Sequence, residues 1–315
     1  MIALPSAQQL RYLTALAESR HFGRAALACS VTQSTLSAGI LALERQLDAA
    51  ILDRSAGKHV VFTPLGLELI ERSETALSAL EAVVEAANAA RAPMSGPLRM
   101  GVIPTIGPFL LPRLMPVLRE GFPQLRLYLR EDTTARLVER LAANRLDVLL
   151  VALPCDCGGA DASPIARDEF LVALPQGHAL TAHEKVPVAA LAGERLLLLE
   201  DGHCLRDQAL AVCGLLAGDR DGQEGFAATS LHTLTQMVAG GLGVTLLPRL
   251  AISAGVAAGT DIALRPVAAS GAWRTLGIAW RPNSPRAAEY RSLVPLLSET
   301  CREALGSAPP ESGTK

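Results

Sequence analysis

A break rich in proline and glycine, Pro93-Met94-Ser95-Gly96-Pro97, divides the sequence into two stretches with different hydrophobic patterns. Before the break, apolar residues recur at the three- and four-residue intervals of helices. After it, short apolar runs typical of strands alternate with helical runs, an order that favours an α/β architecture with parallel sheets. We therefore expect a helical N-terminal part and a separate α/β part.

Two short helical patterns near the N-terminus, at 23–28 and 32–47, are separated only by Cys29-Ser30-Val31. Helices joined by so short a turn indicate a helix-turn-helix, although the pattern alone is more typical of an ordinary helical corner. Thr32 can cap the second helix. The polar side chains that could reach phosphates or base edges of DNA lie at its start: Thr32, Gln33, Ser34, Thr35 and Ser37.

The residues that follow favour DNA binding by an oligomer. Ile51-Leu52 and the alternating segment 59–63 enclose Arg54 and Lys58, which predicts a short hairpin with a basic tip. Pro64 suits the first turn of a long helix that would extend to about Arg91. Its apolar residues form a narrow stripe typical of a dimer seam: Leu69, Ala76, Leu80, Val83 and Ala87.

The stretch after Pro97 contains alternating elements. Strand-like runs cover 98–103, 125–130, 148–152, 196–199 and 244–247, and helical runs cover 109–119, 135–143, 205–215 and 231–239. A single sheet is possible, but the strand-rich stretches near 170–174 and 273–280 could be crossings between two subdomains. In such folds a ligand lies at the strand ends, between the two halves.

The composition excludes several classes of protein. Half of the residues are hydrophobic, which excludes general disorder, and the net charge of −2 argues against a uniformly basic coat for nucleic acid. No basic run precedes an apolar segment at the start, and no stretch of about 18 apolar residues occurs. We therefore expect a cytoplasmic protein without membrane contact, in which any disulfide among the six cysteines is transient.

Four motifs give the chain a family resemblance: Ala25-Ala26, Thr32-Gln33-Ser34-Thr35-Leu36-Ser37, Leu43-Glu44 and Thr63-Pro64-Leu65-Gly66. Apart from about the last ten residues, the sequence resembles a LysR-type transcriptional regulator. Two positions depart from the family pattern. Ala38-Gly39 occupies a place where basic or amide side chains are frequent, and Asp48 stands where the helix usually ends in glycine.

The resemblance implies a winged helix-turn-helix over 1–63 that reads the major groove, and a linker and dimerisation helix over 64–92. It implies an α/β effector module of two subdomains, similar to periplasmic binding proteins, over 97–305, and we expect a disordered tail over 306–315. The implied partners are double-stranded promoter DNA, further copies of the chain in a homodimer or homotetramer, and RNA polymerase.

Within the family, the segments 103–108, 110–112 and above all 200–209 are similar to the members that sense hydrogen peroxide. This similarity implies that Cys204 and Cys213 are the redox-active pair. It also implies that the hydroxyls of Thr105 and Thr134 hold the peroxide and that Asp207 positions the site.

A cysteine that senses peroxide must react as a thiolate. The positive charge of Arg206, a hydrogen bond from His203 and the start of a helix near Leu205 would each favour the thiolate at Cys204. Nine residues of helix separate Cys204 from Cys213 by about 13.5 Å, whereas a disulfide needs its Cα atoms within about 7 Å. Oxidation through a sulfenic acid would therefore require this helix to unwind or refold.

Two other functions remain open. The effector module could instead receive a small metabolite between its subdomains, or the chain could be an enzyme such as a thiol peroxidase, in which the helix-turn-helix would have no purpose. We expect no enzyme activity and no cofactor.

The remaining motifs predict little chemistry. Cys155-Asp156-Cys157 is far short of a zinc signature, so we interpret the pair as loop cysteines and expect no metal. We interpret Cys29 as a small buried side chain, Cys301 as a core or surface residue, and Gly240-Gly241-Leu242-Gly243 as a helix-to-strand turn.

Overall fold

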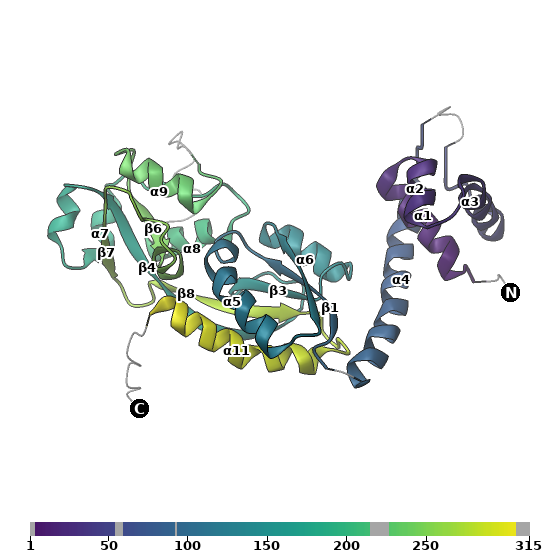
Figure 1. Ribbon diagram of the computed structural model, residues 1–315. Coiled ribbons are helices and arrows are strands. Elements are labelled where there is room, and N and C mark those ends of the chain that lie inside the picture. Colours follow the sequence, from purple (N-terminus) through teal and green to yellow (C-terminus); the bar gives the residue numbers. More distant parts are fainter. Residues whose placement is uncertain (1–3, 54–58, 92, 215–226, 307–315) are drawn as a thin grey trace. The chain divides into compact units, whose positions relative to one another are not determined.

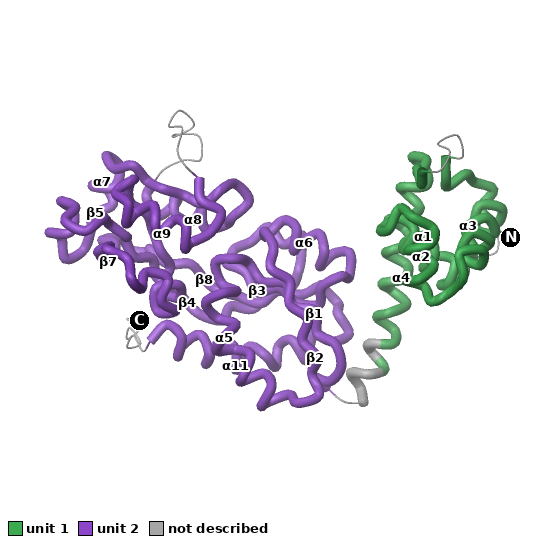
Figure 2. The backbone as a smooth tube through the Cα atoms, turned by 45° about the horizontal axis from the view of Figure 1, so that its top comes forward, with its two compact units in different colours: residues 1–90 green, residues 91–315 purple. Residues whose placement is uncertain are grey.

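A computed structural model describes residues 4–53, 59–91, 93–214 and 227–306. The chain forms two compact units, Met1–Ala90 and Arg91–Lys315, which are described one at a time (Figure 2). Arg54 and Lys58 of the predicted hairpin tip lie outside the described residues, as does nearly all of the predicted tail at 306–315.

The first unit begins with three helices, α1 (Ala7–Ser19), α2 (Phe22–Ala28) and α3 (Gln33–Leu47), packed around a core of Leu13, Leu16, Leu36, Ile40 and Leu43 among others (Figure 1). The axes of α2 and α3 meet at 98°, an angle typical of a helix-turn-helix. As predicted, Thr32 caps α3, because its hydroxyl accepts a hydrogen bond from the Thr35 N–H. Asp48 ends α3 in the left-handed conformation, with a φ of 49°.

The wing and the long helix follow α3. Leu52 and Phe62 pair as an antiparallel bridge, and Oε1 of the buried Glu44 accepts hydrogen bonds from the Ile51 and Leu52 N–H groups. Helix α4 (Pro64–Arg91) begins at the predicted proline. Its apolar side chains stay exposed towards its C-terminal half, with Leu80 at 50% and Val83 at 68% of full exposure. Surfaces of this kind are normally covered by a partner.

The first half of the second unit contains β1 (Gly96–Val102), α5 (Gly107–Gly121), β2 (Leu125–Glu131), α6 (Thr134–Ala142), β3 (Val148–Leu153) and β4 (Asp161–Pro175). After it come a short 3-10 helix (Ala179–Ala182), β5 (Val186–Pro187), α7 (Val188–Leu191), α8 (Cys204–Val212), α9 (Leu231–Ala239), β6 (Thr245–Pro248) and α10 (Arg249–Ser253). The chain then forms β7 (Ile262–Ala268), β8 (Trp273–Trp280) and α11 (Ala287–Leu305). The run predicted as a strand at 196–199 forms only two isolated bridges, at Leu196 and Leu199.

The strands join in the order β2-β1-β3-β8-β4-β7-β5, with β6 also paired to β4. β1 pairs in parallel with β2 and β3, but β8 is antiparallel to β3, and β4 is antiparallel to β6, β7 and β8. The expectation of parallel sheets is therefore wrong for the centre of the unit. The physical reason is that β4 carries the chain from one subdomain into the other and β8 brings it back in the opposite direction, so the crossings pair antiparallel.

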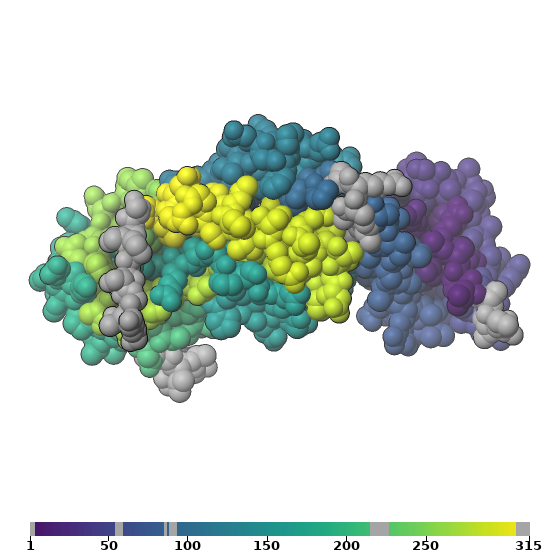
Figure 3. Space-filling view, turned by 90° about the horizontal axis from the view of Figure 1, so that it is seen from below, coloured from purple at the N-terminus to yellow at the C-terminus, as the bar shows by residue number. Residues whose placement is uncertain are grey.

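The predicted crossings at 170–174 and 273–280 are confirmed as parts of β4 and β8. β4 pairs with β8 over Asp161–Glu169 and with β6 and β7 over Phe170–Pro175, so one strand belongs to both subdomains. Helix α11 packs along β4 and α5, and its residues form a continuous band on the face shown in Figure 3. The sheet and α11 together hold in place the strand ends at which the candidate site lies.

Among the described residues, no single helix has both the length and the apolar composition required to cross a membrane. Only the bent pair of α2 and α3 meets these criteria, and only when the two helices are counted together.

Candidate functional site

Cys204 is the first residue of α8, the helix predicted from Leu205 onward. The chain reaches it through Gly202, whose φ of 91° lies in a region that side chains rarely adopt. A Cβ on Gly202 would lie 3.7 Å from Cγ2 of Thr133, so this turn runs against the residue that precedes α6. The turn therefore brings the N-terminus of α8 to the N-terminus of α6.

Thr134 is the first residue of α6, and its Oγ1 lies 2.8 Å from Sγ of Cys204. Either atom could donate this hydrogen bond, but a thiolate can only accept, so the hydroxyl would then be the donor. Both residues stand in the first turn of a helix, where the helix dipole favours negative charge. Thr134 is 8% exposed, which keeps the hydrogen bond largely out of water.

The other three residues predicted around Cys204 make different contacts. Arg206 binds the preceding loop, with Nε 2.9 Å from Oδ1 of Asp201 and Nη1 donating to the Leu199 carbonyl at 3.3 Å. His203 stands at the N-cap of α8 without a side-chain capping bond, and Asp207 is exposed in its first turn. The described hydrogen bonds thus join Thr134 to the sulfur, and the roles of His203, Arg206 and Asp207 stay predictions.

Thr105 follows β1, and Thr134 follows β2. These strands are parallel neighbours, with Val102 opposite Glu131, so the two threonines stand at the same edge of the sheet, three residues beyond paired positions. The predicted association of Thr105 with Thr134 therefore has a basis in the topology. Thr105 is buried, and its Oγ1 accepts a hydrogen bond of 2.7 Å from Nη1 of Arg274, which leaves the hydroxyl proton available for another acceptor.

Arg274 and Asp168 form a buried ion pair beside Thr105 that the sequence analysis did not single out. Both side chains are 0% exposed, and Nε of Arg274 lies 2.9 Å from Oδ2 of Asp168. Arg274 also donates to the Thr105 carbonyl at 2.9 Å, and Asp168 accepts the Leu250 N–H at 2.9 Å. This buried ion pair fixes Thr105 at the sheet edge. The only signal in the sequence was Arg274, the one charged residue of the apolar strand β8, because Asp168 lies in β4 between the charged residues Arg167 and Glu169.

An anionic side chain lies beside the start of α6. Although burial opposes ionisation, hydrogen bonds from the Arg130 side chain and the Thr133 N–H, together with the charges of Arg136 and Arg130, lower the pKa of Asp132. Asp132 therefore stays ionised at neutral pH and holds the arginines near the turn that carries Thr134.

Cys213 is the C-cap residue of α8 and is buried, so the two sulfurs predicted to react stand at opposite ends of one helix. No disulfide joins Cys204 to Cys213 in the described structure. Nine residues of helix correspond to about 13.5 Å along the axis. The predicted geometric obstacle to a disulfide is therefore present in this structure.

The other cysteines differ sharply in their environments. Cys155 and Cys157, predicted only as loop cysteines, are joined to each other by a disulfide. Burial, with a contribution from Asp168, raises the pKa of Cys301 to about 12, so this thiol stays neutral. Burial also raises the pKa of Cys29, and the charge of Arg11 partly opposes this increase.

No group of three or more metal-ligating side chains gathers in the part of the chain that the structure describes.

The polar residues predicted to contact DNA are all exposed along the start of α3: Thr32, Gln33, Ser34, Thr35 and Ser37. The hydroxyl of Thr32 also forms hydrogen bonds with the hydroxyls of Ser34 and Thr35, at 2.9 and 2.8 Å.

The structure explains the glycine at position 39, which departs from the family pattern, because a Cβ on Gly39 would lie 2.5 Å from Cδ2 of Tyr12. Close packing of α1 on α3 therefore excludes a longer side chain at position 39.

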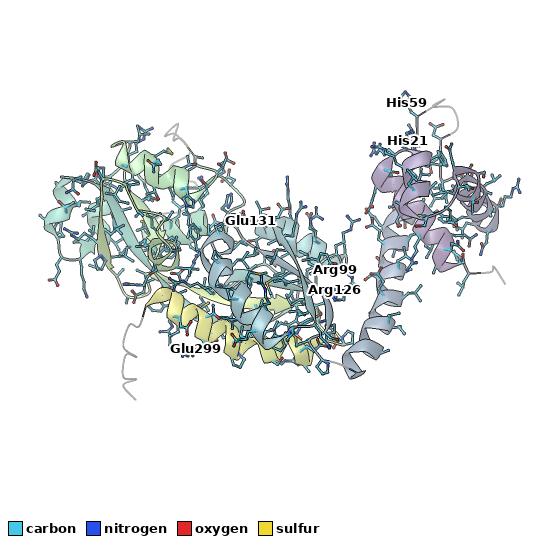
Figure 4. All side chains as sticks on the ribbon, viewed as in Figure 1. His21, His59, Arg99, Arg126, Glu131 and Glu299 are labelled. Atoms are coloured by element: carbon cyan, nitrogen blue, oxygen red, sulfur yellow. A yellow bond between two sulfur atoms is a disulfide. The ribbon has the colours of Figure 1, made fainter. Side chains whose placement is uncertain are left out.

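A cavity of about 430 Å³ lies at the outer edge of the second unit. Figure 4 shows Arg99 and Arg126 on neighbouring strands there, and Arg130, Arg140 and Arg145 complete its basic lining. All of its lining residues come from β1, β2, the end of α6 and the loop that follows α6, within one subdomain. The cavity therefore does not correspond to the metabolite site expected between subdomains.

Comparisons with known proteins cover both units. The family model described as the bacterial regulatory helix-turn-helix protein of the lysR family matches residues 7–67, and the LysR substrate binding domain matches residues 91–302. The DNA-binding transcriptional dual regulator OxyR of Escherichia coli is 42% identical over 287 residues, which cover 91% of this chain and 93% of that protein. A probable hydrogen peroxide-inducible genes activator of Streptomyces viridosporus is 40% identical over 303 residues, 95% of each chain.

Solved structures agree with these relatives. A full-length OxyR variant from Pseudomonas aeruginosa has a TM-score of 0.74 and 35% identity, and the match covers 95% of this chain and 98% of that one. A cysteine variant of Corynebacterium glutamicum OxyR, described as H2O2-bound, has a TM-score of 0.66 and 32% identity, with 97% and 95% covered.

Proposed function

The chain belongs to the LysR family of bacterial regulators, and we propose that it is a peroxide-responsive transcription regulator of the OxyR type, in which Cys204 senses the oxidant. One observation carries the proposal: Cys204 begins α8 and lies 2.8 Å from the Thr134 hydroxyl, while Cys213 ends the same helix. The chemistry and the switch both follow from this arrangement.

In the first step, the Cys204 thiolate attacks one oxygen of hydrogen peroxide. The O–O bond breaks, the sulfur is oxidised to a sulfenic acid, and hydroxide leaves. Thr134 donates a hydrogen bond to the charged reactants, and Thr105, held by Arg274, contributes the second hydroxyl. In the second step, the Cys213 thiol displaces water from the sulfenic acid and the disulfide forms.

The second step changes the conformation of the effector module. The two cysteines cannot approach while α8 persists, so the disulfide requires the helix to open. α8 is suited to this change because it has only nine residues and contains the half-buried Gln208, whose buried Oε1 has no hydrogen-bond partner among the described residues. The bond then holds the chain in the altered state, which changes promoter contacts.

The DNA-bound form is a homo-oligomer, a dimer or a tetramer, assembled through the exposed apolar stripe of α4. Its α3 helices enter successive major grooves of promoter DNA, and the oxidised form acts as an activator in contact with RNA polymerase. The protein works in the cytoplasm as a regulator and not as an enzyme. Peroxide consumption should therefore stop after a stoichiometric reaction unless a reductant resets the disulfide.

Mass spectrometry of the native protein before and after brief peroxide treatment tests the proposal directly. We expect a new Cys204–Cys213 link after treatment. A protein that stays unlinked between these residues while its DNA footprint changes would contradict the proposed route.

Replacing Gln33 by alanine is expected to reduce discrimination between operator and unrelated DNA by about 1–3 kcal/mol, because one base contact is lost. Lys58→Ala should instead weaken binding to all DNA and lower the slope of log affinity against log salt by about 1. Salt-dependent fluorescence anisotropy measures both effects. Lys185→Ala, an exposed lysine of the other unit, is the control and should change neither. Unaltered binding in both test variants would argue against α3 and the wing as the DNA-contacting surface.

Replacing Thr134 by valine keeps the shape of the side chain and removes its hydroxyl. A hydrogen bond to a charged group is worth about 1.5–3 kcal/mol, so sulfenic acid formation at Cys204 should slow roughly tenfold to hundredfold. Stopped-flow oxidation measures the rate. Thr133→Val is the matched control, because that neighbouring side chain makes no capping hydrogen bond and its loss should leave the rate unchanged. Equal rates for both variants would remove Thr134 from the peroxide site.

A further inference from the structure

The segment Cys155-Asp156-Cys157, which follows β3 after Pro154, contains a disulfide that the peroxide reaction at Cys204 does not use. We propose that Cys155 and Cys157 form a second thiol–disulfide couple, separate from Cys204 and Cys213, whose oxidation state adjusts the reaction of Cys204 with peroxide. The adjustment of Cys204 rests on the proposed function, whereas the couple itself does not.

The geometry allows this couple to open and close locally. The Cα atoms of Cys155 and Cys157 are 5.2 Å apart, within the range that a disulfide requires. Both residues lie in one short loop between β3 and β4, so no helix has to unwind before the bond forms. Cys204 and Cys213, by contrast, stand at opposite ends of α8, so their disulfide requires the helix to open. Forming the Cys155–Cys157 bond therefore needs a smaller change in the backbone.

A purely structural role does not account for this bond. A disulfide stabilises a fold mainly by restricting the unfolded chain, and this effect grows with the length of the loop that it closes. Here the two cysteines are separated by two positions in the sequence, so the closed loop is very short. The bond also links no two secondary-structure elements that would otherwise separate.

The loop is accessible to small thiols and to peroxide. Asp156, Gly158 and Gly159 are exposed, Cys155 is half-buried, and Cys157 is only 8% exposed. Access therefore favours Cys155 as the sulfur that reacts with an incoming reagent and Cys157 as the sulfur that leaves or resolves.

Small thiols can reduce this disulfide, and hydrogen peroxide can form it again. For reduction, a thiolate of a small thiol attacks Sγ of Cys155 and expels Cys157, and a second small thiol then releases Cys155, so two thiols become one disulfide. For oxidation, the Cys155 thiolate attacks hydrogen peroxide to give a sulfenic acid. The Cys157 thiol then displaces water, so the dithiol and one peroxide yield the disulfide and two waters.

The loop also lies beside the helix that carries Thr134. Gly158 has a φ of 60°, and a Cβ at that position would lie 3.6 Å from Cγ1 of Val138 in α6. Val138 follows Thr134 by four residues, so both lie on the same face of α6. Opening the ring frees the loop beside Val138, and a shift of α6 would move the Thr134 hydroxyl relative to the Cys204 sulfur.

The first experiment tests the couple without the peroxide sensor. Full-length Cys204→Ser protein is equilibrated in mixtures of reduced and oxidised glutathione, alkylated, digested and analysed by mass spectrometry. The peptide containing Cys155 and Cys157 should pass from two alkyl groups to none as the mixture becomes more oxidising. Cys301, buried and neutral, is the internal control and should stay unalkylated before unfolding. A peptide that never changes, or that carries one glutathione and one thiol throughout, would overturn the proposal.

The second experiment tests the coupling to Cys204. Cys213→Ser protein is poised with Cys155 and Cys157 either reduced or oxidised, freed of glutathione, and mixed with peroxide in a stopped-flow instrument. We expect rates of sulfenic acid formation that differ roughly twofold to thirtyfold, the range typical of coupling between packed elements. The same protein carrying Cys155→Ser and Cys157→Ser should show one rate after both treatments.

The outcomes of the two experiments can be told apart. Equal rates in the two redox states would refute the coupling even if the glutathione titration succeeds. A Cys204 that does not react with peroxide in either state would refute the proposed function and the coupling together, while the titration would still decide whether the couple exists.

Discussion

Cys204→Ser protein is expected to give no transcriptional response to hydrogen peroxide, because no thiolate remains to attack the oxidant at the start of α8. The variant should still fold and bind DNA as the reduced protein does, since serine retains a group that can hydrogen-bond to Thr134. A promoter fused to a reporter gene measures the response. Cys301→Ser is the control, because that buried thiol plays no part in the proposed reaction and its removal should leave the response intact. A response that survives in Cys204→Ser protein would exclude Cys204 as the sensor.

Cys213→Ser separates sensing from switching. Cys204 should still react with peroxide at the normal rate, but its sulfenic acid would persist or become over-oxidised, because the resolving thiol is missing. The transcriptional response should be blunted and not silent. Mass spectrometry should find the sulfenic or sulfinic form of Cys204 in this variant and the Cys204–Cys213 disulfide in the natural sequence.

Opening of α8 should also be visible by hydrogen exchange. In the natural sequence, oxidation should accelerate exchange of the backbone amides between Leu205 and Val212, because their helical hydrogen bonds must break before the sulfurs meet. Helix α9, which also has nine residues, is the matched control and should keep its protection. A disulfide that forms without faster exchange in α8 would mean that another movement brings the cysteines together.

The structural features that could be predicted from the sequence are those determined by residues close together along the chain. Thr32 could be expected to cap α3, and Pro64 to begin α4, because capping and proline geometry depend on residues only a few positions apart. The left-handed Asp48 belongs to the same class. The start of α8 beside Cys204 also followed from local periodicity, but the helical run predicted at 205–215 extends too far, because α8 ends at Val212 and Cys213 is its C-cap residue.

The contacts that sequence reasoning missed join distant residues. Arg274 meets Asp168 across 106 positions and Thr105 across 169, and no local pattern encodes such a pairing. The antiparallel centre of the sheet was missed because alternating strands and helices predict parallel neighbours, whereas β4 and β8 cross between the subdomains. The contact between Thr134 and Cys204 was expected only through resemblance, since 70 positions separate the two residues.

Arg274→Met is expected to cause the largest loss of stability of any substitution considered for the second unit. It leaves the carboxylate of Asp168 buried with the Leu250 N–H as its remaining described hydrogen-bond partner, and it removes the donors that hold Thr105. Breaking a buried ion pair by removing one partner typically costs about 3–5 kcal/mol. Urea denaturation at constant protein concentration, followed by a probe in the second unit, should show the midpoint falling accordingly.

The neighbouring pair of Arg249 and Glu169 provides the matched control. Nη2 of Arg249 lies 2.7 Å from Oε2 of Glu169, but these side chains are 37% and 52% exposed. Because water screens exposed pairs, Arg249→Met should cost only about 0–1 kcal/mol. Arg274→Met and Arg249→Met thus make the same change beside consecutive carboxylates, and burial alone should separate their effects.

The double substitution Arg274→Met with Asp168→Leu decides whether the cost comes from an uncompensated charge or from lost packing. If the buried carboxylate is responsible, removing it together with the arginine should restore most of the stability, because replacing a whole buried ion pair by apolar groups is often neutral or stabilising. Thr105 would still lack its donors, so peroxide should react more slowly with Cys204 in this stable protein. Restored stability with a slow reaction would assign the ion pair to positioning Thr105. A double variant as unstable as Arg274→Met would instead attribute the loss to packing around β4 and β8.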